Sequence, residues 1–351
     1  MIETFIEFFA GIGFMRLAME KCGVRCVFSN EICPKKCKIY DQNFGKPSVT
    51  CADIRKIPSN KIPHADLATI SFPCTDVSVI HQVNRTLDGP NSSIVWYVLD
   101  LISKMGDSKP KCLLLENVVG LLTANSGRDI LTLLDELEKI GYSYDITTLD
   151  AVHFVPQTRN RVFVFAIQTK LIHSATSCDE ELHKRPLSIQ RLWKQRPWPF
   201  LLSITQRHSE KKNIQDFIHD LPEHDELWFD DRKTQYWLKR LSGPVSQYNQ
   251  RYYVGKRRHN AVHLKKESYC LLTSDRLVIF DLKDTPRIRY MTVDECLMLQ
   301  GVSGFKFETV STAVAIAFIG DAVCVPVVCY IMEAFTRTTS HINCVPCGFE
   351  L

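Results

Sequence analysis

Apolar and polar segments alternate in a regular way from the start of the chain. Residues 4–9 form a short apolar run, residues 10–13 are typical of a tight turn, and apolar side chains then recur at helical spacing over residues 14–21. A second apolar run covers residues 25–30 and ends at Glu31. Strand, glycine turn, helix, strand and acid form the outline of a nucleotide-binding βαβ unit, in which Glu31 would meet a ribose hydroxyl.

The same alternation continues to about residue 170. It predicts further strands and helices, the strands at residues 65–70, 112–115, 152–155 and 162–167 and the helices at residues 94–105 and 130–140. Strands that alternate with helices indicate an α/β fold with a mostly parallel, doubly wound sheet. Asp53, which follows another short segment, offers a second polar contact for a nucleoside.

The character of the chain changes after about residue 170. Residues 184–266 are polar, and aromatic and basic residues are interleaved there without a βαβ rhythm. Such residues can contact phosphates and stack against bases, or they can form a solvated surface with a few core aromatics. We therefore predict a first domain at residues 1–185, a smaller second domain at residues 186–309, and a return to the first domain at residues 310–351 through an apolar helix at 325–335.

Composition narrows the class of protein. The 351 residues suffice for two domains, and 45% hydrophobic with 23% charged residues is typical of a soluble globular protein. We find no apolar run long enough to cross a bilayer and no signal peptide, so the 14 scattered cysteines indicate a reduced, intracellular protein. An HxxCxxC tail, His341, Cys344 and Cys347, is at most half a zinc site, and we expect no metal. The net charge of +4 permits nucleic-acid binding without arguing for it.

Reactive side chains lie close to the ends of three predicted strands. Cys74 follows one apolar strand, Glu116 follows another, and the pair Arg159 and Arg161 follows a third. One edge of one sheet would collect all of them. A thiolate adds to an electron-poor ring, an acid bonds the ring nitrogen, and an arginine holds a carbonyl oxygen or a phosphate. Two plainer interpretations stay open: Cys74 as a buried small hydrophobe, and Glu116 with Arg161 as a buried ion pair.

The chain resembles the DNA (cytosine-5) methyltransferase family in a series of motifs that occur in family order from residue 5 to about residue 330. These motifs are Phe8-Phe9-Ala10-Gly11-Ile12-Gly13, Phe72-Pro73-Cys74, Glu116-Asn117-Val118, Gln157-Thr158-Arg159-Asn160-Arg161, Arg289 through Gly301, and Gly320-Asp321-Ala322-Val323. Four positions depart from the usual pattern of the family, namely Glu7, Phe14, Thr75 and Asp321.

The resemblance implies a Rossmann-like methyltransferase sheet with a smaller target recognition domain. It also implies the cofactor S-adenosyl-L-methionine, the product S-adenosyl-L-homocysteine and no metal. The cofactor contacts that it implies are Phe9, Ala10, Gly11, Gly13, Glu31, Ile32, Asp53, Ile54, Pro73, Asp321 and Val323.

The same resemblance implies a mechanism on a cytosine rotated out of the DNA duplex. Cys74 would attack C6 of the ring, and Glu116 would bond N3 and the exocyclic amine. Arg161 would hold the extruded nucleotide, and Arg159 would support Glu116.

Double-stranded DNA is the partner that the resemblance implies, with residues 81–89 as a mobile loop that closes over it. The expected DNA contacts are Arg85, Arg251, Lys256, Arg257 and Arg258. We expect a monomer that belongs to a restriction–modification system, in the cytoplasm of a bacterium or archaeon or in the nucleus of a eukaryote.

Three alternatives are weighed against this interpretation. A tRNA cytosine methyltransferase of the same superfamily would carry a Cys-Phe-Thr triplet, which the sequence lacks, and a shorter middle region. A DNA-recognition protein without turnover is disfavoured by the intact Cys74, Glu116 and Arg161. A nicotinamide enzyme would fit the glycine turn but not the combination of Cys74, Glu116 and Arg161.

Overall fold

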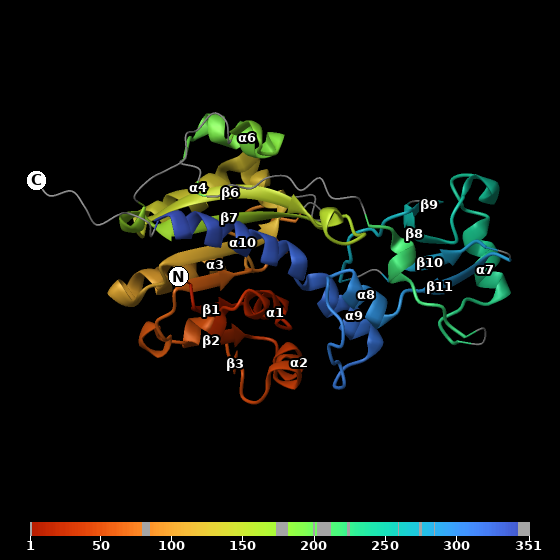
Figure 1. Cartoon of the computed structure of the whole chain (residues 1–351), viewed down its shortest axis with the longest axis horizontal. Helices are drawn as coiled ribbons and strands as arrows, with labels where there is room; N and C mark the ends of the chain where they lie inside the picture. Colours follow the sequence, from red (N-terminus) through yellow and green to blue (C-terminus); the bar gives the residue numbers. More distant parts are fainter. Residues whose placement is uncertain are drawn as a thin grey trace, which may run out of the picture. The chain divides into compact units, whose positions relative to one another are not determined.

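The chain divides into two compact units, each assembled from separate stretches of sequence (Figure 1). The computed structural model describes residues 2–78, 85–172, 182–198, 201, 212–222, 225–258, 260–273, 276–283 and 285–342. Unit 1 comprises Met1–Leu149, Asn160–Gln206 and Val328–Leu351, and unit 2 comprises Asp150–Arg159 and Arg207–Val327. The domain limits drawn from the sequence, 1–185, 186–309 and 310–351, differ from these ranges and stay predictions.

A seven-stranded sheet forms the centre of unit 1, in the order β3-β2-β1-β4-β5-β7-β6. Its strands are β1 (Thr4–Phe8), β2 (Arg25–Glu31), β3 (Thr50–Cys51), β4 (Leu67–Ile70), β5 (Cys112–Val118), β6 (Tyr142–Asp150) and β7 (Asn160–Gln168). The helices of this unit are α1 (Phe14–Lys21), α2 (Pro34–Phe44), α3 (Ile94–Lys104), α4 (Arg128–Lys139), α6 (Leu187–Gln195) and most of α10 (Val325–Ile342). The pairs β1–β2, β1–β4, β2–β3 and β4–β5 are parallel, and β5 pairs with β7 in antiparallel orientation.

Hydrophobic periodicity explains these elements. The apolar face predicted at residues 14–21 is confirmed by α1, which buries Phe14, Met15, Ala18 and Met19. All four residues of β4 are buried, as expected for a central parallel strand with both faces covered. The helix α10 packs on β7, where the rings of Phe165 and Phe335 lie 4.0 Å apart between centroids.

The strand predicted at residues 152–155 is wrong. The strand in this region is β6, which ends at Asp150, and Ala151–His153 is a short 3-10 helix. The Asp150 carboxylate accepts hydrogen bonds from the backbone N–H groups of Val152 and Arg159. These local side-chain bonds favour a turn over a strand, although the segment is apolar.

Unit 2 contains a four-stranded antiparallel sheet in the order β11-β10-β8-β9. Its elements are α7 (Asp231–Leu238), β8 (Tyr252–Arg258), β9 (Ala261–Lys265), β10 (Val278–Asp281), β11 (Arg287–Tyr290), α8 (Val293–Met298) and α9 (Thr312–Asp321). A Cβ at Gly255 on β8 would lie 2.2 Å from the ring of Phe280, so only glycine admits this aromatic side chain into the small core.

One segment is apolar enough to cross a membrane, contrary to the expectation from the sequence. Residues Thr312–Phe335 have a mean hydropathy of 2.3 in an 18-residue window. In the structure this segment is two helices, because α9 ends at Asp321 and α10 begins at Val325. The window is 61% buried, and core helices of soluble proteins meet the same criterion.

Candidate active site

The turn after β1 contains three residues in the left-handed backbone region, which favours glycine. Phe9, Gly11 and Gly13 have positive φ angles of 59°, 59° and 94°. The N–H of Ala10 donates to the Asn30 carbonyl at 2.9 Å, which ties the turn to the end of β2. A Cβ at Gly13 would lie 2.3 Å from the Phe44 ring of α2, so this glycine allows close packing, while the space beside Gly11 is open.

Glu31 lies against this turn at the end of β2. Its side chain is buried, and one carboxylate oxygen accepts the Gly11 N–H at 2.8 Å while the other accepts the Cys33 N–H at 2.8 Å. The neighbouring Ile32 is 60% exposed, which is unusual for a large apolar side chain. A fixed carboxylate beside an exposed apolar surface suits a nucleoside, with the acid for hydroxyl groups and Ile32 for a ring face.

The second predicted nucleoside contact is already engaged with a neighbour. The Asp53 carboxylate accepts bonds from the guanidinium of Arg55 at 2.6 to 3.1 Å, and these hydrogen bonds lower the pKa of Asp53 to about 2. The side chain of Ile54 is buried in the core of unit 1, so only its backbone is placed to meet a ligand.

Cys74 lies in the loop that follows β4, and it is partly exposed. The register pairs Ile70 of β4 with Leu115 of β5, one residue before Glu116. The amide of Asn117 donates to the Phe72 carbonyl at 3.1 Å and so joins the two strand ends. The thiol and the acid therefore extend from adjacent strands at the same edge of the sheet.

Arg161 completes this group from β7. Its Nε lies 3.4 Å from Oε1 of Glu116, and register places it opposite Val118. The side chains are 11% exposed for Glu116 and 17% for Arg161, so the pair is largely buried. The ion pair weighed as a plain alternative thus forms.

Arg159 has other described partners than the one predicted for it. Its guanidinium donates to the carbonyls of Leu271 (3.3 Å), Gly320 (3.1 Å) and Ala322 (2.6 Å), all within unit 2. These bonds make Arg159 a structural centre of unit 2, and a role beside Glu116 stays a prediction.

The last predicted cofactor contacts, Asp321 and Val323, flank the end of α9. Asp321 is exposed and Val323 is buried. A Cβ at Gly320 would lie 2.8 Å from the backbone of Leu272, so this glycine brings two chain segments together within unit 2.

Arg251 and Arg257, two of the expected DNA contacts, bind other side chains of unit 2. Arg251 forms ion pairs with Asp220 at 2.8 Å and Asp281 at 3.0 Å, and Arg257 donates to the Tyr236 hydroxyl at 2.6 Å.

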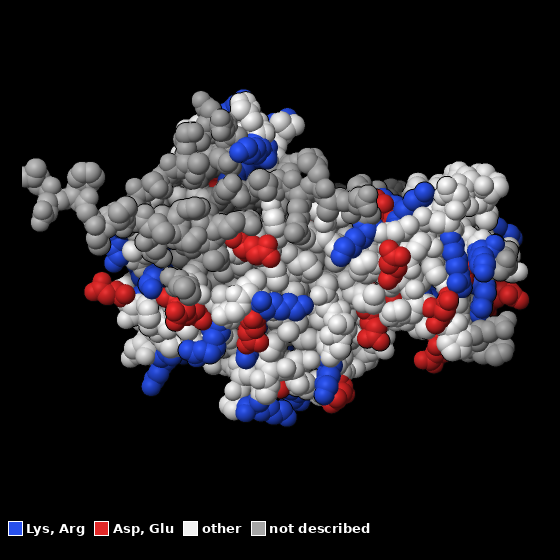
Figure 2. Space-filling view, viewed as in Figure 1, with Lys and Arg blue, Asp and Glu red and all other residues white. Residues whose placement is uncertain are grey.

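The other expected contacts have varied surroundings. Arg85 donates to Thr123, Lys256 is half-buried, and Arg258 lies on β8 with its side chain outside the described residues. On the face shown in Figure 2, Lys and Arg are interspersed with Asp and Glu.

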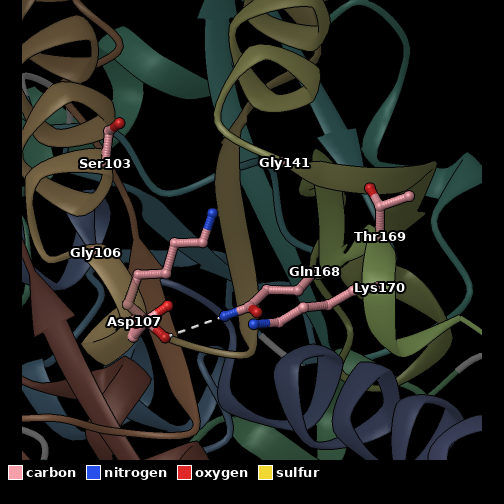
Figure 3. A pocket seen from close by; sticks show the side chains of 8 residues that line it. Ser103, Gly106, Asp107, Gly141, Gln168, Thr169 and Lys170 are labelled. Atoms are coloured by element: carbon pink, nitrogen blue, oxygen red, sulfur yellow. Dashed lines mark hydrogen bonds between the residues drawn. The ribbon is translucent and has the colours of Figure 1, made fainter.

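A separate hollow of about 450 Å³ lies in unit 1, away from these groups (Figure 3). Its lining comprises Ser103, Gly106, Asp107, Lys109, Gly141, Gln168, Thr169 and Lys170. It lies near Cys112, where β5 begins, whereas Glu116 lies towards the other end of that strand. The Gln168 amide donates to the Lys109 carbonyl at 3.2 Å, and the Lys109 ammonium donates to the Ile140 carbonyl. These polar groups of the hollow therefore stabilise the fold of unit 1.

Metal ligation has little support in the described residues, where no group of three or more His, Cys, Asp or Glu is arranged to hold an ion. Cys344 and Cys347 of the HxxCxxC tail lie outside the described residues, as do residues 81–84 of the loop expected to be mobile. Leu87, from the second half of that loop, is fully buried in the core of unit 1, so this half is anchored.

Sequence reasoning missed the polar residues that connect these loops. The sequence marks Asn117 only as part of a motif, and it gives no indication of a role for Asp76. Asp76 binds the backbone at Asn91 and Ser92, and a contact over such a separation leaves no local pattern.

Comparison with known proteins identifies the class. The C-5 cytosine-specific DNA methylase pattern matches residues 3–337, and the chain belongs to this family. The type II methyltransferase M.MspI of Moraxella sp is 28% identical over 341 residues, which cover 97% of this chain and 72% of that protein. M.BsuFI of Bacillus subtilis is 38% identical over 170 residues, which cover 48% of this chain and 40% of that protein, less than half its length.

Solved structures show the same fold. The S. pombe Dnmt2 methyltransferase superimposes with a TM-score of 0.67 at 17% identity, over 97% of this chain and 99% of that chain. The family resemblance and the α/β fold class predicted from the sequence are thus confirmed.

Proposed function

We propose that the protein transfers a methyl group from S-adenosyl-L-methionine to C5 of a cytosine extruded from double-stranded DNA, with Cys74 as the nucleophile. The observation that carries this proposal is the placement of Cys74 and Glu116 on adjacent strand ends, with Arg161 3.4 Å from Glu116. The family and its type II methyltransferase relatives agree with this reaction.

The residues of unit 1 fit the cofactor. Gly11 faces open space, Glu31 is held by two backbone N–H groups, and Ile32 offers an exposed apolar surface. Glu31 would bind the ribose hydroxyls and Ile32 would cover the adenine. When bound, S-adenosyl-L-methionine supplies an electrophilic methyl group.

The side chains divide the chemistry between them. The Cys74 thiolate forms a bond to C6, and the electron pair of the C5=C6 bond moves so that C5 becomes nucleophilic. Glu116 would bond N3 and the exocyclic amine, which stabilises the charge that develops on the ring. After C5 has been methylated, water takes up the C5 proton, the electron pair of the C–H bond restores the C5=C6 bond, and Cys74 leaves as the thiolate. Arg161 would orient the carboxyl of Glu116 and hold the extruded nucleotide.

The decisive experiment compares two cysteine variants in a host that lacks cytosine methylation. Bisulfite sequencing of host DNA should show a methylated site with the wild type. The control variant Cys51→Ser, which changes an exposed cysteine on β3, should give the same result. Cys74→Ser should bind DNA and S-adenosyl-L-homocysteine but leave the DNA unmethylated. Full methylation by Cys74→Ser would remove Cys74 from the mechanism.

The finer aspects of the role are part of the same proposal. We infer that the protein acts as a monomer on a specific DNA sequence, as the modification enzyme of a restriction–modification system in the cytoplasm. Its relatives named type II methyltransferases support this role. A parallel assay measures methyl transfer to unmodified tRNA. Methylation of tRNA but not of DNA would contradict the assignment of DNA as the substrate.

A further inference from the structure

The segment between the nucleophile loop and α3 is bound by one carboxylate that the proposed mechanism does not use. The Asp76 Oδ2 accepts the backbone N–H of Asn91 at 2.8 Å and of Ser92 at 2.7 Å, and Oδ1 accepts the Asn91 side-chain amide at 3.1 Å. Although burial acts to raise it, the pKa of Asp76 is lowered by these hydrogen bonds, so the carboxylate is ionised at neutral pH.

Gly89 lies so close to the Asp76 side chain that no Cβ fits between them. A Cβ at Gly89 would lie 2.5 Å from the Cβ and Cγ of Asp76 and 2.6 Å from its Oδ2. Real Cβ atoms do not approach so closely, so a side chain at this position would displace Asp76. Position 89 therefore needs glycine for space.

The carbonyl groups around Cys74 are also held. Ser92 Oγ donates to the Pro73 carbonyl at 2.8 Å, and the N–H groups of Val77 and Ser78 donate to the Cys74 carbonyl at 3.1 and 2.9 Å. On the other side, the Asn117 amide donates to the Phe72 carbonyl.

Ser92 links the two sets of bonds. Its N–H binds the Asp76 carboxylate and its hydroxyl binds the Pro73 carbonyl, one residue before the nucleophile. A loop whose backbone is bonded on both sides has few alternative positions, and nucleophilic attack demands an accurate approach of sulfur to carbon.

We propose that Asp76 is a positioning residue that, through Ser92, fixes the Pro73–Cys74 peptide for attack on the cytosine ring. This inference rests on the proposed function of Cys74. It assigns to Asp76 no contact with the reacting atoms.

The test uses Asp76→Ala, which removes both carboxylate oxygens and with them the acceptors for the N–H groups of Asn91 and Ser92. The matched control is Asp88→Ala, in the same segment, where the exposed carboxylate accepts only the Trp96 indole and no loop backbone among its described bonds.

We expect the single-turnover methylation rate at saturating DNA and cofactor to fall on the order of 10²-fold in Asp76→Ala. Dissociation constants for DNA and S-adenosyl-L-homocysteine should stay within roughly threefold of the wild type, and Asp88→Ala should match the wild type. A wild-type rate in folded Asp76→Ala overturns the inference, as does an equal loss of rate, of both affinities and of melting temperature.

Two further measurements keep the inference testable. Gly89→Ala should slow turnover in the wild-type background and add no further loss in Asp76→Gly, which lacks the Cβ, Cγ and Oδ2 atoms that the new Cβ would meet; additive losses would contradict a direct clash between positions 76 and 89. If the wild type does not methylate DNA, the proposed function fails. The rate of Cys74 alkylation by iodoacetamide then still reports on the position of the loop that carries Cys74. Asp76→Ala should change the alkylation rate of Cys74 relative to that of Cys51, and an unchanged ratio of the two rates would refute its positioning role.

Discussion

Glu7 provides a prediction that can be worked out in detail. The side chain lies in the middle of β1 and is 1% exposed, and the Tyr40 hydroxyl donates to its Oε2 at 2.7 Å. Its Oε1 is buried without a hydrogen-bond partner among the described residues. Burial raises the pKa of Glu7 from 4.5 to about 8, more than the Tyr40 hydrogen bond lowers it.

The sign of the effect on stability follows from proton binding. Between pH 4.5 and about 8 the folded protein keeps a proton on Glu7 that the unfolded chain has released. The unfolded state binds fewer protons over this range, so the free energy of unfolding falls as the pH rises, by about 1.4 kcal/mol for each pH unit. Over the whole range Glu7 removes on the order of 5 kcal/mol.

Glu7→Gln should abolish this dependence, because the amide is neutral at every pH and its oxygen can still accept the Tyr40 hydrogen bond. Urea denaturation at pH 5, 7 and 9 measures the free energy of unfolding of both proteins. The variant should gain stability over the wild type as the pH rises, and Glu3→Gln, at an exposed position, serves as the control. Parallel pH profiles for wild type and Glu7→Gln would refute the assignment of a buried, neutral carboxyl.

Three further variants test other parts of the structure. Glu295→Gln disrupts a fully buried ion pair with Arg289 at 2.5 Å, and the free energy of unfolding should fall by about 3–5 kcal/mol; calorimetry that finds less than about 1 kcal/mol contradicts this. Gly13→Ala places a Cβ 2.3 Å from an aromatic ring of α2, so titration calorimetry should show weaker S-adenosyl-L-homocysteine binding, and unchanged binding would show that the turn tolerates a side chain. Arg161→Met should lower the methylation rate at saturating DNA more than it lowers DNA affinity, and the reverse order would make Arg161 mainly a DNA contact.

Periodicity and motif order are sufficient to predict the fold class and the edge of the sheet at which the chemistry lies. The helix at Phe14–Lys21 and the buried strand before Cys74 form where the apolar pattern predicts them. The strand predicted at residues 152–155 fails because an apolar segment is also compatible with a turn, and the turn is decided by hydrogen bonds to Asp150.

Side-chain partners are harder to predict than elements. Arg251 has the composition of a DNA contact, yet Asp220 and Asp281 neutralise it across 31 and 30 residues of sequence. Arg159 likewise binds carbonyls more than 110 residues away. Such pairings depend on the register and approach of distant segments, which a single sequence does not display.

The interleaved order of the two units has a consequence for biosynthesis. Unit 1 begins at the first residues of the chain and includes Val328–Leu351, so the helix that covers β7 is translated after all of unit 2. The small antiparallel sheet of a nascent chain can therefore form before α10 has been translated. At that stage the large sheet that carries the nucleophile Cys74 still lacks this helix. Premature termination upstream of α10 would release a product whose large sheet has an uncovered apolar face, a natural target for chaperones and proteases.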